Sequence, residues 1–136
     1  MAVSAALFPG EAEGALLVLT APLSFWGGVA ATTGAIVDPR HPQHGTCVAG
    51  RILVVPEPVG SSSSSAVLLE LIRVGLAPAG IVLGRADAIL VVGCLAAREM
   101  GWPAPPVLVM SGCAALPAGR ARIAQDRLVL LPSEGS

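Results

Sequence analysis

Apolar residues along this chain fall into short blocks that proline, glycine and polar residues separate. A short apolar run bounded by turn residues is typical of a buried strand. Blocks of this kind predict strands at residues 15–20, 46–55, 81–84, 106–112, 120–126 and 127–131. The last two blocks meet at Gln125 and Asp126, which predicts a hairpin that turns there.

Three less regular segments complete the first half of the pattern. Residues 23–28 are expected to form a strand or an approach loop that ends in a glycine turn. Residues 35–37 are expected to form a short strand. Residues 38–45 combine Asp-Pro, His-Pro and a glycine, which predicts a loop.

The second half of the chain predicts two helices. One begins in the serine run 61–65, places its apolar residues at helical spacing and ends at Gly75. The other is a short helix over 95–100, stopped by Gly101. The apolar block 86–93 before it is expected to be a strand, with Asp87 near its start.

The order of these elements predicts one domain over residues 15–132, with a ragged lead-in over 1–14 and a short tail over 133–136. Strands outnumber helices and no repeat or linker divides the chain. This pattern favours a compact β/β/α domain over a doubly wound α/β sheet.

The serine run after Gly60 is the candidate for chemistry. Serine is a preferred N-cap, and a helix start exposes free N–H groups and a positive dipole end that attract anions. Glycine lets the backbone turn tightly and lets a ligand come close. A flexible linker or a plain helix cap explains the same letters, and these alternatives stay open here.

Composition predicts a partner. Hydrophobic residues make up 54% of the chain and charged residues 12%, which is apolar for a protein that is alone in solution. A dense α/β core with buried parallel strands is the alternative. The net charge is -1 and no basic patch is present, so the sequence does not favour nucleic acid or an anionic membrane as a partner.

Residues 14–37 carry no charge, which raises the question of a membrane span. Pro22, Gly27 and Gly28 interrupt this stretch, and its apolar parts are only as long as strands. No positively charged region precedes it. We therefore expect a soluble, cytoplasmic protein.

Cysteine and histidine do not predict a metal site in this chain. Cys94 and Cys113 are widely spaced from each other and from Cys47, whereas a disulfide framework or a cubane cluster needs a different pattern. His41, His44 and Cys47 lie three apart, but the nearby prolines Pro39 and Pro42 disfavour a regular helix, so this spacing does not place the three side chains on one face. Either histidine is a candidate polar contact to a substrate or a partner.

Other constellations are weaker still. Arg51 is either a surface arginine or a carboxylate clamp near the serine loop. Trp26 beside two glycines is more typical of a core or an interface than of a binding platform. No G-x-S-x-G elbow is present, so a serine hydrolase triad is not supported.

Four segments in order carry a family resemblance: LSFWGG at 23–28, TGAIVDPRHPQHG at 33–45, the stretch 49–83 and ADAILVVG at 86–93. This set resembles the small, swivelling subunit of the aconitase X family, whose members are hydro-lyases related to aconitase. The resemblance covers roughly residues 15–115. It implies a swivelling β/β/α fold with a mixed, barrel-like sheet and few helices.

The resemblance also implies a division of labour. The large subunit of the family carries an iron–sulfur cluster that acts as a Lewis acid on the leaving hydroxyl, so no cofactor is expected in this chain. A serine of the swivelling domain takes the proton, and the first serine after the glycine is Ser61 here. Gly60, Ser62 and Ser63 are then expected to bind the substrate carboxylate.

The chain departs from the family pattern at one position. Family members often carry arginine just before this glycine, where Val59 stands here. Arg51 is the candidate substitute, and His44 is a further candidate for a substrate contact. The glycine–serine–helix pattern itself is intact.

Substrates divide the family. Its bacterial members dehydrate cis-3-hydroxy-L-proline and its archaeal members mevalonate 5-phosphate. An alanine-rich chain whose eight basic residues are all arginine favours a bacterial or other GC-rich source, and hence the hydroxyproline reaction. A stand-alone anion-binding module and a structural subunit with a serine cap are the non-catalytic alternatives.

Overall fold

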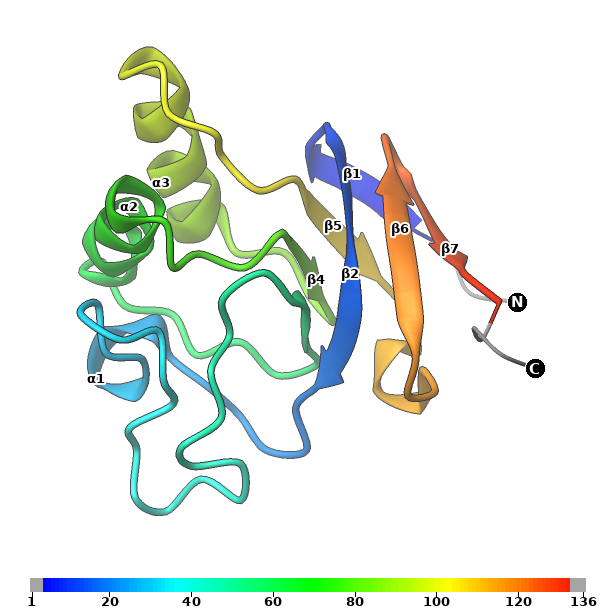
Figure 1. Ribbon diagram of the computed structural model, residues 1–136, viewed down its shortest axis with the longest axis horizontal. Coiled ribbons are helices and arrows are strands. Elements are labelled where there is room, and N and C mark those ends of the chain that lie inside the picture. The colour runs from blue at the N-terminus through cyan, green and yellow to red at the C-terminus, as the bar shows by residue number, and fades with distance from the viewer. Residues whose placement is uncertain (1–3, 133–136) are drawn as a thin grey trace.

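The computed structural model describes residues 4–132, which form one curved sheet and three helices (Figure 1). The strands are β1 (Ser4–Phe8), β2 (Glu11–Val18), β3 (Ile52–Val55), β4 (Gly80–Leu83), β5 (Val107–Met110), β6 (Arg120–Ala124) and β7 (Arg127–Leu130). The helices are α1 (Phe25–Gly28), α2 (Ser64–Val74) and α3 (Ala88–Glu99), with a short 3-10 turn, η1, at Cys113–Ala115. Among the described residues, no helix is long and apolar enough to cross a membrane.

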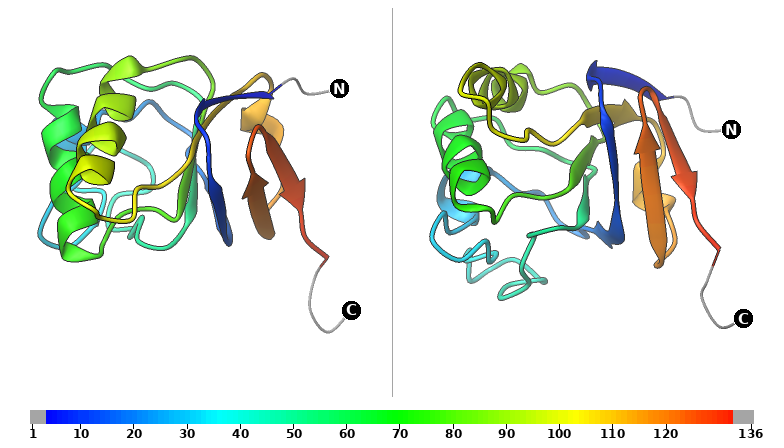
Figure 2. Two further views of the ribbon diagram at one scale, coloured as in Figure 1. Left: turned by 90° about the horizontal axis from the view of Figure 1, so that it is seen from above. Right: turned by 45° about the horizontal axis from the view of Figure 1, so that its top comes forward.

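The seven strands follow the order β1-β5-β4-β3-β2-β6-β7. The four central strands, β2 to β5, are parallel, and β1, β6 and β7 are antiparallel to their neighbours. The crossovers through α2 and α3 both advance in the same direction, and right-handed crossovers of this kind place both helices on one face. Figure 2 shows α2 and α3 together at one end and the β6–β7 hairpin at the other.

Alternate residues of the central strands fill two separate cores. Leu53 and Val55 of β3 belong to the core under the helices, whereas Ile52 and Val54 belong to the core on the other face. The sheet curls so that Ile123 of β6 closes this second core. Burial on both faces explains why these strands are continuous apolar runs in the sequence.

Several predicted elements are confirmed. The strands at 81–84 and 106–112 correspond to β4 and β5, and β6 and β7 form the predicted hairpin with Gln125 at a φ of 60° in its turn. α2 ends at Gly75, whose left-handed backbone closes the helix as predicted. The loop at 38–45 contains turns and bends. The β/β/α arrangement with helices on one face is also confirmed.

The predicted strand at 86–93 is wrong, because it forms α3 together with the helix expected at 95–100. Asp87 is the N-cap of this helix, and its Oδ1 accepts a hydrogen bond of 2.9 Å from the N–H of Ile89. Gly93 does not end an element. It lies where a Cβ atom would be 2.9 Å from the carbonyl oxygen of Ser65, so its lack of a side chain lets α3 pack on α2.

The expected lead-in at 1–14 is also corrected. Residues 4–8 form β1 and residues 11–14 form the first half of β2, in which exposed Glu11 and Glu13 alternate with Ala12 and buried Gly14. This alternation suits antiparallel pairing with β6 on one covered face. The tail at 133–136 lies outside the described residues.

Three further boundaries differ from the prediction. The strand expected at 46–55 is limited to β3, because the chain turns at Gly50 with a φ of 68°. Within 35–37, Ala35 and Ile36 make isolated bridges in place of the expected strand. Residues 23–28 end in a short helical turn, α1, whose Gly27 has a φ of 76°. These segments are held by contacts with distant residues, which local sequence does not encode.

Candidate active site

The parallel strands β2 to β5 end at one edge of the sheet, which we call the carboxyl edge. The loops at 19–24, 56–63 and 84–87 follow β2, β3 and β4 there. Ligands of open α/β sheets bind outside the carboxyl ends of parallel strands, because loops from neighbouring strands converge at that edge. The serine run therefore lies at the edge where a site is expected.

Ser61 forms an ordered turn rather than a linker. Its carbonyl oxygen accepts a hydrogen bond of 2.9 Å from the N–H of Ser64, and its Oγ lies 3.4 Å from the nitrogen of Ser63 as an acceptor. Ser63 is the N-cap residue of α2, but its side chain makes no capping hydrogen bond to the helix. The hydroxyl of Ser61 thus bonds to the backbone of the N-cap residue, and the carbonyl oxygen of Ser61 accepts from the first N–H of the helix.

The five serines have different roles. Ser64 is buried, and its Oγ accepts a hydrogen bond of 3.2 Å from the N–H of Trp26 and lies 3.4 Å from Oγ of Ser24. The hydroxyl of Ser65 donates to the carbonyl oxygen of Ser62 within the same turn. Ser62 is exposed, and Ser61 and Ser63 are half-buried, in the loop that follows β3 at the carboxyl edge.

Replacing Ser64 by alanine is expected to destabilise the fold locally. The N–H of Trp26 would lose its acceptor, and the loss of one partly buried hydrogen bond costs about 1 kcal/mol of unfolding free energy. Urea unfolding measures this difference, and exposed Ser62 replaced by alanine is the matched control. A Ser64 variant as stable as the Ser62 variant would contradict this role.

The loop after β3 runs beside the loop after β2. The N–H of Val59 donates to the carbonyl oxygen of Leu23 at 2.9 Å, and the N–H of Leu23 donates to that of Glu57 at 3.3 Å. This pairing leaves two large apolar side chains exposed near the serine turn, Trp26 by 60% and Val59 by 46%. With Val37, exposed by 41% and bonded through its N–H to Gly28, they form what we call the apolar rim.

The sequence analysis did not identify Arg85, which lies on the loop after β4. Its guanidinium donates a hydrogen bond to the carbonyl oxygen of Pro58, and its Nη1 lies 3.9 Å from Oε2 of Glu57. Pro58, Gly60 and Arg85 line a hollow of about 360 Å³ at the carboxyl edge. Only the strand order could have identified it. β4 lies next to β3 in parallel, so the loop after β4, which carries Arg85, lies beside the loop after β3, which leads to the serine run.

Arg51 lies at the opposite edge. It precedes β3, whereas the serine run follows it. Its Nε and Nη2 donate to the carbonyl oxygens of Ala15 and Leu16 at 3.3 and 3.1 Å. The structure therefore does not bring Arg51 and Ser61 together, and of the two alternatives that the sequence left open for Arg51, a clamp near the serine loop does not fit this position.

The loop at 38–45, which carries both histidines, contacts Thr20 and Ala21 at the carboxyl edge, and the two histidines differ in burial. His41 is buried, and its Nδ1 accepts from the N–H of Gln43 at 3.0 Å, so its Nε2 donates to the carbonyl oxygen of Ala21 at 3.2 Å. His44 is exposed on the same loop. Nowhere in residues 4–132 do three or more His, Cys, Asp or Glu side chains gather in a metal-binding arrangement.

The cysteines do not fit an iron–sulfur cluster in this chain. Cys94 belongs to the core under the helices and Cys113 to the core on the other face of the sheet, while Cys47 is exposed. Burial raises the pKa of Cys94 to about 12 and also raises the pKa of Cys113. Cluster ligands are neighbouring thiolates, whereas Cys94 and Cys113 lie on opposite faces of the sheet and Cys47 lies apart on an exposed loop.

The same pKa shifts predict selective thiol labelling. In the native chain, exposed Cys47 is expected to react with Ellman's reagent, whereas Cys94 and Cys113 stay protonated and shielded. In denaturant all three thiols are expected to react. Mass spectrometry of the labelled sites checks this, and rapid native labelling of Cys94 would contradict the packing of α3.

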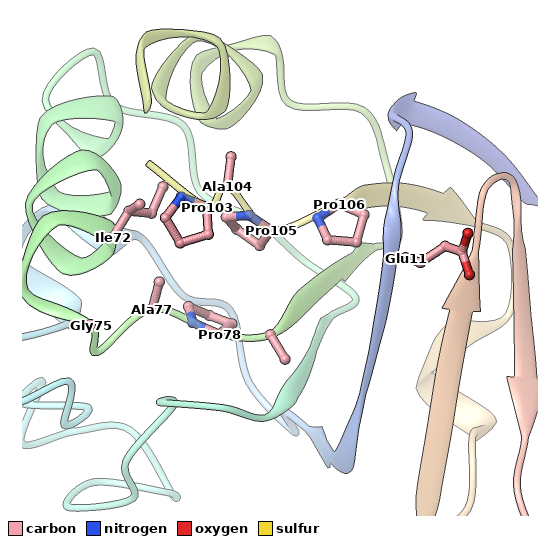
Figure 3. Close-up of a pocket in the computed structure, with 10 residues that line it drawn as sticks. Glu11, Ile72, Gly75, Ala77, Pro78, Pro103, Ala104, Pro105 and Pro106 are labelled. Atoms are coloured by element: carbon pink, nitrogen blue, oxygen red, sulfur yellow. The ribbon is translucent and has the colours of Figure 1, made fainter. Parts of the chain in front are cut away.

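A second hollow, of about 300 Å³, lies near the C-terminal end of α2 (Figure 3). Most residues that line it have apolar side chains or none, including Ile72, Gly75, Ala77 and a run of prolines and alanine over 103–106. Glu11 is the charged residue of the lining, and Figure 3 shows its carboxylate directed toward β6 and away from the prolines. This hollow offers little chemistry, whereas the carboxyl edge offers hydroxyls, N–H groups and Arg85.

Comparison with known proteins gives a consistent match. Residues 2–126 match the family described as the aconitase X swivel domain. A cis-3-hydroxy-L-proline dehydratase of Pseudomonas aeruginosa is 41% identical over 128 residues, which is 91% of this chain and 22% of that protein. A phosphomevalonate dehydratase small subunit of Methanopyrus kandleri is 51% identical over 87 residues, which is 64% of this chain and 63% of that protein. The chain thus spans less than two thirds of either relative.

The fold is also similar to a solved structure. The crystal structure of Thermococcus kodakaraensis aconitase X in its holo form superposes with a TM-score of 0.83 and 29% sequence identity. The match covers 97% of this chain and 99% of the matched chain. The swivelling fold expected from the sequence is therefore confirmed.

Proposed function

The chain belongs to the aconitase X swivel-domain family, and on that premise we propose that it is the small subunit of a hydro-lyase, in which Ser61 is the catalytic base. The observation that supports this role is the ordered turn at the carboxyl edge. It holds the Ser61 hydroxyl just before an 11-residue helix, 3.4 Å from the N–H nitrogen of Ser63, the N-cap of that helix. Both relatives described above are dehydratases by name.

The proton step needs a stabilised serine oxygen. In such a dehydration the base removes a proton from the carbon next to a carboxylate, the hydroxyl on the adjacent carbon leaves, and a carbon–carbon double bond forms between the two carbons. Serine is a poor base unless its oxyanion is stabilised. The N–H of Ser63 points at Oγ of Ser61, and the positive end of the α2 dipole lies beside it. Exclusion of water by a docked partner would strengthen both effects.

The neighbouring residues suit recognition of the carboxylate. Ser62, which is exposed, offers its hydroxyl and N–H as donors, and half-buried Ser63 offers its hydroxyl, since its N–H is directed at Oγ of Ser61. A Cβ atom added at Gly60 would meet no atom within 4 Å, so this position is open to a ligand. We keep His44 as a candidate polar contact, because it is exposed on a loop of the carboxyl edge, and we leave Arg51 out of the site.

We propose that the partner is a large subunit and that it holds the iron–sulfur cluster expected of the family. The names of several relatives call them small subunits, and the cysteines of this chain do not fit a cluster. In the apolar rim of Trp26, Val37 and Val59, Trp26 and Val59 lie near the serine turn, and exposed apolar side chains of this kind suit a docked protein surface. Free cysteines suit a reducing compartment, which supports a cytoplasmic location.

We propose cis-3-hydroxy-L-proline as the substrate, with mevalonate 5-phosphate as the alternative. The alignment with the hydroxyproline dehydratase spans more of this chain, whereas the identity with the phosphomevalonate dehydratase subunit is higher over a shorter stretch. Both substrates are hydroxy acids, and a site that binds a carboxylate at a helix start serves either one.

Co-expression with the large subunit from the same genome tests this function. The assembled protein is expected to contain iron and to dehydrate one of the two substrates, and the isolated small subunit is expected to be inactive. An isolated chain that binds inorganic phosphate and forms no complex would instead support the anion-binding module. A complex inactive with both substrates would contradict the proposed reaction.

A further inference from the structure

Arg85 bonds to the loop that leads to the proposed base. Its guanidinium donates to the carbonyl oxygen of Pro58 and lies 3.9 Å from the carboxylate of Glu57. Pro58 is three residues before Ser61, and Arg85 lies on a different loop, after β4. The Arg85 side chain, which follows β4, therefore holds the backbone of the loop that follows β3.

The loop between β3 and the serine turn is held from two sides. On one side, backbone hydrogen bonds join Glu57 and Val59 to Leu23. On the other side, Arg85 bonds to Pro58. Beyond Pro58 little packing is available, because Val59 is exposed by 46% and a Cβ atom at Gly60 would meet open space.

From this arrangement we infer that Arg85 is a positioning residue, which sets the path of residues 58–60 and thereby places the Ser61 oxygen for proton removal. The inference rests on the proposed function, in which Ser61 is the base. Misplacement of a catalytic group by about 1 Å costs about 10²-fold in rate. A loop held on one side only is expected to move its serine by distances of that order.

The hydrogen bond, and not the ion pair, carries this role. The side chains of Arg85 and Glu57 are exposed by 63% and 66%, so water screens their attraction. The bond to the Pro58 carbonyl is directional and charge-assisted. A planar guanidinium can reach the carbonyl and the carboxylate together, and a lysine ammonium reproduces only part of that geometry.

The test uses the assembled two-subunit enzyme with Arg85→Met and Arg85→Lys. Arg85→Met is expected to lower kcat by about 10²-fold and to leave KM and complex formation unchanged, and Arg85→Lys is expected to recover part of the loss. Arg127→Met, an exposed arginine on β7, is the matched control and is expected to keep full activity. An Arg85→Met enzyme with normal kcat, or with raised KM and normal kcat, would overturn the inference.

A double-mutant cycle separates this inference from the proposed function. If Arg85 acts through Ser61, then Arg85→Met causes no further loss of kcat in an enzyme that already carries Ser61→Ala. An equal loss in both backgrounds would show that Arg85 acts independently of Ser61 and would overturn the inference. Near-normal turnover by Ser61→Ala alone would instead overturn the proposed base.

Discussion

Replacing Ser61 by alanine in the assembled enzyme is expected to lower kcat by about 10²- to 10⁴-fold, the contribution typical of a general base. KM, complex formation and the iron content of the partner are expected to stay the same. The reason is that Oγ of Ser61 makes only a long contact of 3.4 Å with the nitrogen of Ser63, so its removal does little to the fold. Steady-state kinetics measures kcat and KM, and iron analysis of the purified complex checks that assembly and iron content are unchanged.

The matched control is Ser65→Ala. Ser65 is in the same run, and its hydroxyl donates only to the carbonyl oxygen of Ser62 in its own turn. This variant is expected to keep nearly full turnover. If both variants lost activity equally, the loss would reflect disruption of the turn, and Ser61 would have no special role. If Ser61→Ala retained near-full turnover, another group would be the base.

The start of α2 could be predicted from the sequence because its signals are local. The apolar spacing of Leu68, Leu71 and Ile72 and the glycine at position 75 all lie within a few turns of the serine run. Each signal acts through neighbouring backbone groups, so no distant contact is needed to identify it. The turn formed by Ser61 refines this prediction but does not change the place of the candidate site.

The choice of arginine failed because it depended on topology. Arg51 is closer in sequence to the serine run than Arg85 is, but β3 separates its guanidinium from that run. Arg85 is more than twenty residues beyond Ser61 and still bonds to Pro58, because β4 lies next to β3 in the sheet. The order of the strands in the sheet decides which loops lie side by side, and the local pattern of apolar and polar residues does not determine that order.

The strand wrongly predicted at 86–93 failed for a related reason. The apolar run ends at Gly93, and a glycine after an apolar block ordinarily suggests the end of an element. Here Gly93 is the contact point between α3 and α2, where a larger side chain would meet the backbone of Ser65. The helix continues through it because packing between the two helices outweighs the intrinsic cost of glycine.

Replacing Gly84 by alanine is expected to lower the free energy of unfolding by about 3 kcal/mol. A Cβ atom at this position would lie 2.1 Å from the carbonyl oxygen of Pro56 and 2.8 Å from its carbonyl carbon. Both are backbone atoms, so the clash cannot be relieved by rotating a side chain. The N–H of Gly84 also donates to the carbonyl oxygen of Val55 at 3.0 Å, and separation of β3 from β4 would weaken that bond.

Gly60→Ala is the matched control for stability, because the added Cβ atom there meets nothing within 4 Å. Its unfolding free energy is expected to stay within about 0.5 kcal/mol of the parent chain. Urea unfolding of both variants makes the comparison, and equal m-values would show that the two unfolding free energies can be compared directly. Equal stability of the two variants would mean that β3 and β4 separate easily at the carboxyl edge. Such freedom would also weaken the inference on Arg85, since its bond to Pro58 requires the same close approach of the two loops.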